Sequence, residues 1–386
     1  MNAIRKLLLA LCALLGLACA ARAEEITLAQ MKEQAPNYLQ MTVTAETGET
    51  VEILAPVVLP EGDALPVLRC RQATFDASHM TDFYPRDPDE PAYMRIAGTY
   101  WNVEDSPLLV VLRNWDHGDG RTVHKRLPQG ELPPYVEVDA DRAKEILLEE
   151  AARFDCDIVP ELRLERAVPY SGVYSTKAGT FFEADKAIAG KERGMWNLEF
   201  SQVLRGARVI SNFYYPTGEP GAEDGMVEVW GSVTNADINI SAEDEYAMSL
   251  SLLVEESELL PDSPLLPFDA LEKIIESRVA GGQLHSVYTL TLGYYPFYEA
   301  GKRRNDWITD ENGNEAQDPH STATYVLKPV WRIQGVDEKD RGHFGIDGEA
   351  PDREEVLFHD PGDPDFELLL DARTGQMLTS NRYLQE

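Results

Sequence analysis

Hydrophobic side chains recur along most of this chain at every second position, which is the spacing of a strand with one buried face. The pattern is clearest at residues 51–55, 196–200 and 290–294, where polar or small residues largely fill the intervening positions. We predict strands over residues 50–59, 65–71, 95–101, 108–115, 162–168, 196–201, 203–210, 226–240, 246–255, 287–294, 324–333 and 366–371. Turn-forming residues such as glycine, proline and aspartate separate several of these runs.

A second pattern, with hydrophobic residues three and four positions apart, predicts two amphipathic helices. The first covers residues 139–154 and opens with an aspartate suited to the N-cap position. The second has Asp269 as its N-cap, with Glu272 three residues on as in a capping box, and it ends at a glycine pair. Two shorter helices are predicted at residues 27–35 and 76–84.

The order helix–strand–strand–strand therefore occurs twice, near residues 139–255 and 268–380. This order predicts an α+β fold in which each helix packs on one face of an antiparallel sheet. The predicted domains are a small β-rich unit over residues 24–135, a helix-plus-sheet unit over 136–260, and a second such unit over 261–386.

Three C-terminal segments carry a recognisable pattern, namely the helix FDALEKIIESRV, the strand YVLKPVWRI and the strand-turn segment ELLLDARTGQML. In that turn Asp371 is placed to accept hydrogen bonds from the backbone ahead of it, and Gly375 is suited to a positive φ. Over about 110 residues these segments resemble PepSY-type extracytoplasmic domains and the related cystatin-like layout. The resemblance implies an accessory role of the kind in which exported proteins restrain membrane sensor kinases of Gram-positive bacteria. It carries over no catalytic residue.

The N-terminal run VEILAPVVLPEGDALPVLRCR resembles a family of exported clostridial proteins and lipoproteins that has no assigned function. This second resemblance implies export from a Gram-positive bacterium and brings no mechanism.

The first 23 residues have the parts of a secretory signal peptide. Arg5 and Lys6 precede an apolar run at residues 7–21, which is shorter than the roughly 20 residues of a membrane-spanning helix. Small residues then occupy the positions that a signal peptidase recognises, and they predict cleavage after Ala23. The alternative is a bacterial lipoprotein acylated at Cys19 and tethered to the outer face of the cell membrane. No comparable apolar run follows, so no transmembrane segment is expected after cleavage.

The chain is strongly acidic, with 67 aspartates and glutamates against 35 lysines and arginines, a net charge of −32. Loss of the three basic residues of the signal would make the exported chain more acidic still. Such a surface repels nucleic-acid phosphates and anionic lipid headgroups, so we expect no nucleic-acid partner. The acidic residues are spread along the sequence, which is typical of a solvated surface.

Two cysteines remain beyond the signal, Cys70 and Cys156. One interpretation is a disulfide between them in an oxidising compartment, which would stabilise the fold by about 4 kcal/mol because the closed loop is long. The alternative is two free thiols. Without a C-x-x-C spacing they predict neither a zinc site nor a thioredoxin-type motif.

Signatures of catalysis and of metal binding are missing from the sequence. The seven histidines are not spaced as metal-ligand pairs, and the acidic segments at residues 116–119 and 310–314 favour turns. Counted from Asp310, the loop lacks the glycine and glutamate of an EF-hand. We therefore predict no catalytic residue, no metal ligand and no cofactor.

The densest aromatic cluster comprises Tyr294, Tyr295, Phe297 and Tyr298. These side chains would either pack inside the sheet or form an exposed row that binds a glycan or a peptide. The sequence as a whole favours an exported, non-enzymatic protein that binds a protein partner at the cell envelope, such as a membrane sensor or an exported peptidase, by edge-strand or sheet-face docking. The alternatives are a glycan- or ligand-binding module that uses these tyrosines and a hydrolase with an unrecognised site.

Overall fold

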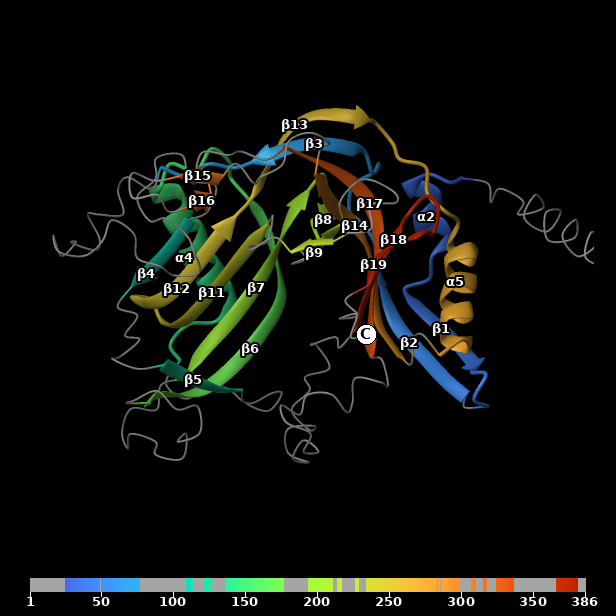
Figure 1. Cartoon of the computed structure of the whole chain (residues 1–386), viewed down its shortest axis with the longest axis horizontal. Helices are drawn as coiled ribbons and strands as arrows, with labels where there is room; N and C mark the ends of the chain where they lie inside the picture. The colour runs from blue at the N-terminus through green and yellow to red at the C-terminus, as the bar shows by residue number, and fades with distance from the viewer. Residues whose placement is uncertain are drawn as a thin grey trace, which may run out of the picture.

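The structure is a computed structural model, and its strands form two large sheets that stand side by side (Figure 1). It describes residues 25–48, 50–76, 109–113, 121–126, 136–176, 194–210, 214–216, 226–228, 234–282, 284, 286–298, 307–309, 315–317, 324–336 and 366–380. Over these residues the fold is α+β, with many strands and few helices. None of the helices found in these ranges is long and apolar enough to cross a membrane.

The larger sheet has eight strands and gathers both ends of the described chain. Its main path runs β1-β2-β14-β17-β18-β19, and β3 joins β13 to β17. Neighbours are antiparallel except where β14 meets β2. Its strands are β1 (Tyr38–Thr44), β2 (Thr50–Val58), β3 (Val67–Gln72), β13 (Leu253–Leu260), β14 (Ser286–Tyr298), β17 (Thr324–Val336), β18 (Phe366–Asp371) and β19 (Met377–Ser380).

The second sheet has seven strands in the order β4-β12-β11-β7-β6-β5, and β8 pairs with β7. Its strands are β4 (Leu109–Arg113), β5 (Arg121–Arg126), β6 (Glu161–Thr176), β7 (Met195–Leu204), β8 (Ala207–Arg208), β11 (Asn235–Ala242) and β12 (Glu245–Ser251). Two short hairpins complete the described strands, β9 (Tyr214–Pro216) with β10 (Met226–Glu228) and β15 (Trp307–Thr309) with β16 (Glu315–Gln317).

The described helices are α2 (Leu28–Gln34), α4 (Ala140–Arg153) and α5 (Phe268–Ala280). In Figure 1, α4 lies beside the seven-stranded sheet, while α2 and α5 lie on the outer side of the eight-stranded sheet. The predicted N-cap of α4 is confirmed, because the Asp139 carboxylate accepts a hydrogen bond of 2.9 Å from the Arg142 N–H. The predicted N-cap of α5 is wrong. Pro267 occupies that position without a side-chain cap, and Asp269 lies in the first turn.

Sheet membership corrects the expected domain boundaries. The segment 24–135 does not form a separate β-rich unit, because β1, β2 and β3 join the C-terminal strands while β4 and β5 join the seven-stranded sheet. The chain changes sheets again at Leu252, between β12 and β13. A helix does precede an antiparallel meander twice, as α4 with β6-β7-β11-β12 and as α5 with β14-β17-β18-β19. Alternation identified the strands, but it contains no information about which strands pair.

A tight glycine contact joins the two halves of the molecule. The turn between β7 and β8 contains Gly206, whose φ of +75° is in the left-handed region. Its carbonyl accepts a hydrogen bond of 2.8 Å from the N–H of Glu61, and a Cβ on Gly206 would lie 2.5 Å from the nitrogen of Gly62. Nearby, the Gln202 amide donates to the Leu253 carbonyl at 2.7 Å and accepts from the Leu253 N–H at 2.8 Å. These contacts fix the point where the chain crosses between sheets.

Charged groups reinforce the same junction. Arg205 makes a bidentate pair with Glu255 at 2.7 and 2.9 Å. Deeper in, one oxygen of Glu165 accepts from Arg208 at 2.8 Å and from Arg332 at 3.4 Å, which links β6, β8 and β17. Burial raises the pKa of Glu165, but the two guanidinium charges outweigh it, so the pKa lies below its ordinary value.

Candidate functional site

The aromatic cluster predicted from sequence does not form an exposed row. Tyr294 and Tyr295 are completely buried, and Phe297 is partly buried against Tyr295 with ring centroids 5.2 Å apart. The side chain of Tyr298 lies outside the described residues. Adjacent residues of a strand point to opposite faces of the sheet, so the burial of both tyrosines means that both faces of β14 are covered at this point. The alternative in which these residues form an exposed glycan-binding row is therefore wrong for Tyr294 and Tyr295.

The two cysteines of the exported chain are free thiols. Cys70 is buried in the core of the eight-stranded sheet, and this burial raises its pKa to about 12. Cys156 is half-buried against the core of the other sheet. Of the two alternatives, the structure has free thiols and no Cys70–Cys156 disulfide, because the two side chains belong to different cores.

Several sequence predictions lie outside the described residues. These are the signal peptide with Cys19, the predicted helix at 76–84 beyond its first residue, the predicted strand at 95–101, and the acidic loops at residues 116–119 and 310–314. Among the side chains that are described, no three His, Cys, Asp or Glu residues gather closely enough to hold a metal ion.

One polar network has no counterpart among the predictions from sequence, and two strands of the seven-stranded sheet form it. On β11 and β12 the Ser249 hydroxyl donates to the Asp237 carboxylate, and the Asn235 amide lies within hydrogen-bond distance of both. Burial raises the pKa of Asp237. Each group is already bonded to the other two, which is the pattern of a structural network. The signal for it is the row of polar residues at every second position of β11.

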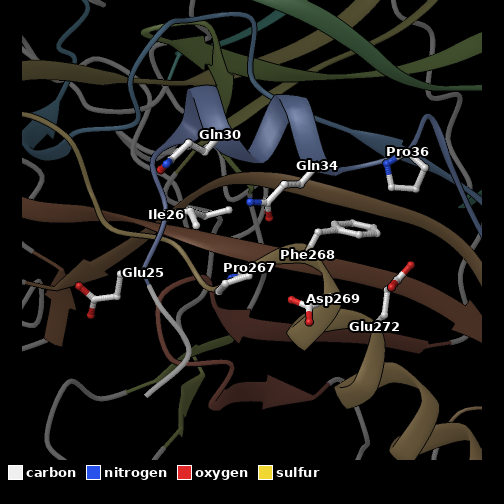
Figure 2. Close-up of a pocket in the computed structure, with 9 residues that line it drawn as sticks. All are labelled: Glu25, Ile26, Gln30, Gln34, Pro36, Pro267, Phe268, Asp269 and Glu272. Carbon is white, nitrogen blue, oxygen red and sulfur yellow. The ribbon is translucent and has the colours of Figure 1, made fainter. Parts of the chain in front are cut away.

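A surface groove lies between α2 and the first turn of α5 (Figure 2). Its volume is about 770 Å³. It runs from Glu25 and Ile26 at one end to Pro36 at the other, with α2 along one side and α5 along the opposite side. The residues that line it are Glu25, Ile26, Gln30, Gln34, Pro36, Pro267, Phe268, Asp269 and Glu272.

Local sequence places each wall of this groove. Thr27 caps α2 through a capping box with Gln30, and Gln30 and Gln34 of this helix line the groove. A backbone bridge ties the N-terminal segment to the start of α5, because Ile26 and Leu265 exchange hydrogen bonds of 2.9 and 2.8 Å. Phe268 packs below, 6.1 Å from the buried ring of Trp331. The two walls are thus anchored in one hydrophobic core.

The predicted turn after β18 supports the same region. The Asp371 carboxylate accepts from the N–H groups of Arg373 and Thr374 at 3.0 and 2.8 Å, and Gly375 has a φ of +69°, so both expectations are confirmed. Gly375 packs closely against Ile274 of α5. The turn therefore packs against α5 and the segment before it, since the N–H of Leu266 also bonds to the Ala372 carbonyl at 2.8 Å.

Three of the nine lining residues are acidic and none is basic. Glu25 pairs with Arg373 at 2.8 Å, and Asp269 pairs with Lys273 at 3.2 Å, both as exposed ion pairs at the rim. Glu272 makes no ion pair with any described residue. Exposed ion pairs of this kind are weak and exchange readily. The groove therefore offers carboxylates beside an apolar floor, which suits a cationic and apolar ligand.

No family model matches this chain, and no curated protein matches it. Among solved structures, the chain is similar to an uncharacterized protein from Eubacterium rectale, with 11% sequence identity and a TM-score of 0.44. The similarity covers 91% of this chain and 96% of that one.

Proposed function

We propose that this chain is an exported, non-enzymatic binding protein of a bacterial cell envelope, and that the groove between α2 and α5 binds its partner. The observation that carries the proposal is the lining of the groove. Carboxylates of Glu25, Asp269 and Glu272 surround an apolar floor that contains Ile26 and Phe268, and no lysine or arginine is among the lining residues.

The charge of the chain indicates the chemistry of the partner. With a net charge of −32, the protein attracts cationic surfaces over a range of about 10 Å at moderate ionic strength. Within the groove, a lysine or arginine would exchange with the exposed partners of the lining carboxylates. A flanking apolar side chain would cover Phe268 and Pro267. The partner is thus a protein segment that carries basic and apolar residues together, as part of a membrane sensor or an exported peptidase.

Export is supported by the N-terminal sequence. The basic pair at residues 5–6, the apolar run that follows and the small residues before Glu24 favour cleavage after Ala23 and secretion, with acylation at Cys19 as the alternative. Either outcome puts the groove on the outer side of the cell membrane. Intact-mass measurement of the mature chain from its host distinguishes them, because acylation adds lipid mass and leaves Cys19 as the first residue.

The PepSY-like interpretation of the C-terminal unit is part of the same proposal. It is supported by the order of α5 and the sheet strands β14, β17, β18 and β19 that follow it, and by the turn at Asp371. A PepSY-like unit of this kind is expected to act by binding and to use no catalytic residue.

A direct test uses two matched peptides and two matched variants. The peptides are a labelled Lys-Leu-Lys-Phe and its charge-reversed counterpart Glu-Leu-Glu-Phe. The variants are Glu272→Lys, in the groove lining, and Glu276→Lys, which lies one turn further along α5 at an exposed position outside the groove. Both variants change the net charge of the chain equally.

We expect the exported chain to bind the basic peptide and not the acidic one. Glu272→Lys should weaken this binding at least tenfold, while Glu276→Lys should change it less than twofold. Equal weakening by both variants would mean that only net charge matters, and it would refute the groove as the site. Thermal unfolding of both variants verifies that each is folded.

A further inference from the structure

The strand next to the groove, β1, is an edge of the eight-stranded sheet. It pairs with β2 over all seven of its residues, from Tyr38↔Pro56 to Thr44↔Thr50, and no strand in the described part of the chain lies along its other side. In Figure 1 it lies at the margin of the sheet, beside α5. An edge of this kind presents a row of unpaired backbone N–H and C=O groups.

The register identifies which backbone groups of β1 face outward. The carbonyl of Asn37 accepts a hydrogen bond of 2.9 Å from the N–H of Val57, so the backbone groups of Asn37 point toward β2. In an antiparallel ladder such residues alternate with residues whose backbone groups point away. Leu39, Met41 and Val43 therefore bond to β2. The outward N–H and C=O groups belong to the residues between them, namely Tyr38, Gln40, Thr42 and Thr44.

The second observation is that the sequence and pairing of β1 lack the charges, prolines and bulges that protect many sheet edges. Its sequence YLQMTVT contains no charged residue, no proline and no glycine, and its pairing with β2 shows no bulge. The edge strand β13 differs in its charge and in the regularity of its pairing. It has two register shifts against β3, and it carries Glu255, Glu256 and Glu258. Bulges and charges discourage strand pairing, and an uncharged regular edge with β-branched residues favours it.

The third observation is that this edge begins where the groove ends. Pro36 lines the groove and lies two residues before Tyr38, a residue that is 57% exposed. α5 then runs alongside β1, and at the far end the N–H of Glu46 bonds to the carbonyl of Ala280 at 2.9 Å. An extended chain paired with β1 would therefore have one end at the carboxylates of the groove.

We propose that the edge of β1 binds an extended segment of the partner as an additional antiparallel strand, and that basic residues directly after this strand enter the groove. The proposal rests on the proposed function, since it names the form in which the partner is bound. Antiparallel pairing is slightly more stable per residue than parallel pairing. Because β1 runs away from the groove, an antiparallel segment runs toward it. The segment thus alternates apolar and polar residues and ends in lysine or arginine at its C-terminal side.

The probe is a synthetic peptide, Thr-Val-Thr-Val-Thr-Val-Thr-Lys-Lys, and its control is the same composition with both lysines at the N-terminus. Hydrogen exchange of the exported chain with and without peptide is the primary measurement. We expect the amide hydrogens of Gln40 and Thr42 to exchange at least tenfold more slowly when the probe is bound. The amides of Leu39 and Met41 already bond to β2, so their exchange should change little. The control peptide should bind at least fivefold more weakly.

A second measurement uses variants at one edge position. Thr42→Pro removes an outward N–H that β2 does not use, and it should weaken binding of the probe at least tenfold, while Thr42→Val should leave it within twofold. An N-methylated probe provides the same test without changing the protein. Methylation of the alternate probe amides that face β1 should abolish binding, and methylation of the amides that face away from β1 should not.

The outcomes separate this inference from the proposed function. Binding that depends on Glu272 but leaves the Gln40 and Thr42 amides unprotected would overturn strand addition and leave the groove as the site. Protection of these amides without dependence on Glu272 would support strand addition and refute the groove. A dimer of the free chain that Thr42→Pro dissociates would assign the edge to a second copy and overturn the inference.

Discussion

Replacement of Gly206 by alanine provides the sharpest test of how the two sheets are joined. Gly206 has a φ of +75°, where an alanine costs about 1 kcal/mol because its Cβ crowds the backbone. In addition, its Cβ would lie 2.5 Å from the nitrogen and 3.2 Å from the Cα of Gly62. Backbone atoms cannot rotate away as a side chain would. Forced separation costs about 2 kcal/mol, and the total for Gly206→Ala is about 3 kcal/mol.

Two other glycines separate these contributions. Gly48 has a φ of +85°, and a methyl group added there would have no described atom within 4 Å, so Gly48→Ala should cost only about 1 kcal/mol. Gly62 has no positive φ, but its Cβ would lie 2.5 Å from the Arg205 carbonyl oxygen, so Gly62→Ala should cost about 2 kcal/mol through crowding alone. The three variants thus measure the free-energy cost of the positive φ alone, the cost of the steric crowding alone, and the sum of the two.

The assay is urea unfolding, in which tryptophan fluorescence and circular dichroism monitor the folded fraction. We expect the free energy of unfolding to decrease in the order Gly48→Ala, Gly62→Ala, Gly206→Ala. The reasoning is refuted if Gly206→Ala destabilises the protein no more than Gly48→Ala. In that case the turn between β7 and β8 would not be held against Gly62.

Three further predictions concern the same junction and the thiols. Gln202→Ala should destabilise the protein by about 2–4 kcal/mol in urea unfolding, because it leaves a buried backbone N–H and a carbonyl without partners; a loss under about 0.5 kcal/mol would contradict the hydrogen bonds described. Glu165→Gln should destabilise the fold at pH 7 by about 3 kcal/mol, since it leaves two arginines uncompensated. The folded-state pKa of Glu165 is depressed, so its carboxylate stabilises the fold above the unfolded pKa of about 4.3, and this stabilisation is lost as the pH falls through the folded-state pKa. If the difference in unfolding free energy between wild type and variant stays constant from pH 7 to pH 3, this explanation is refuted. At pH 8 iodoacetamide should label Cys156 at least tenfold faster than Cys70, and a mass 2 Da below that of the dithiol would instead reveal a disulfide.

Short-range patterns located most of the described elements to within a few residues. The helix expected at residues 27–35 is α2, with Thr27 as its cap, and the helix expected at 139–154 is α4. The turn at Asp371 was also predictable, because an aspartate that bonds the next N–H groups and a glycine with positive φ act within five residues. Such features depend on contacts between near neighbours, which the sequence displays directly.

The errors arose where distant contacts decide. The aromatic run on β14 was compatible with packing inside the sheet and with an exposed row, and Tyr294 and Tyr295 are both buried because both faces of the strand are covered there. Asp269 was expected to cap α5, but the preceding segment is held by Leu265 against Ile26 and the helix begins at Phe268. In each case the competing contact comes from a segment far along the chain.

The sequence by itself determined the helices, most of the strands, the acidic charge and the signal-like N-terminus, because these follow from composition and from spacings of two to four residues. Only the tertiary structure decided that the first three strands complete the C-terminal sheet, and that residues 25–36 and 267–272 face each other across a groove. The physical reason is that strand pairing and helix packing satisfy backbone hydrogen bonds and bury apolar surface between any compatible partners. Many partners are compatible in a local pattern, and the complete set of contacts selects one.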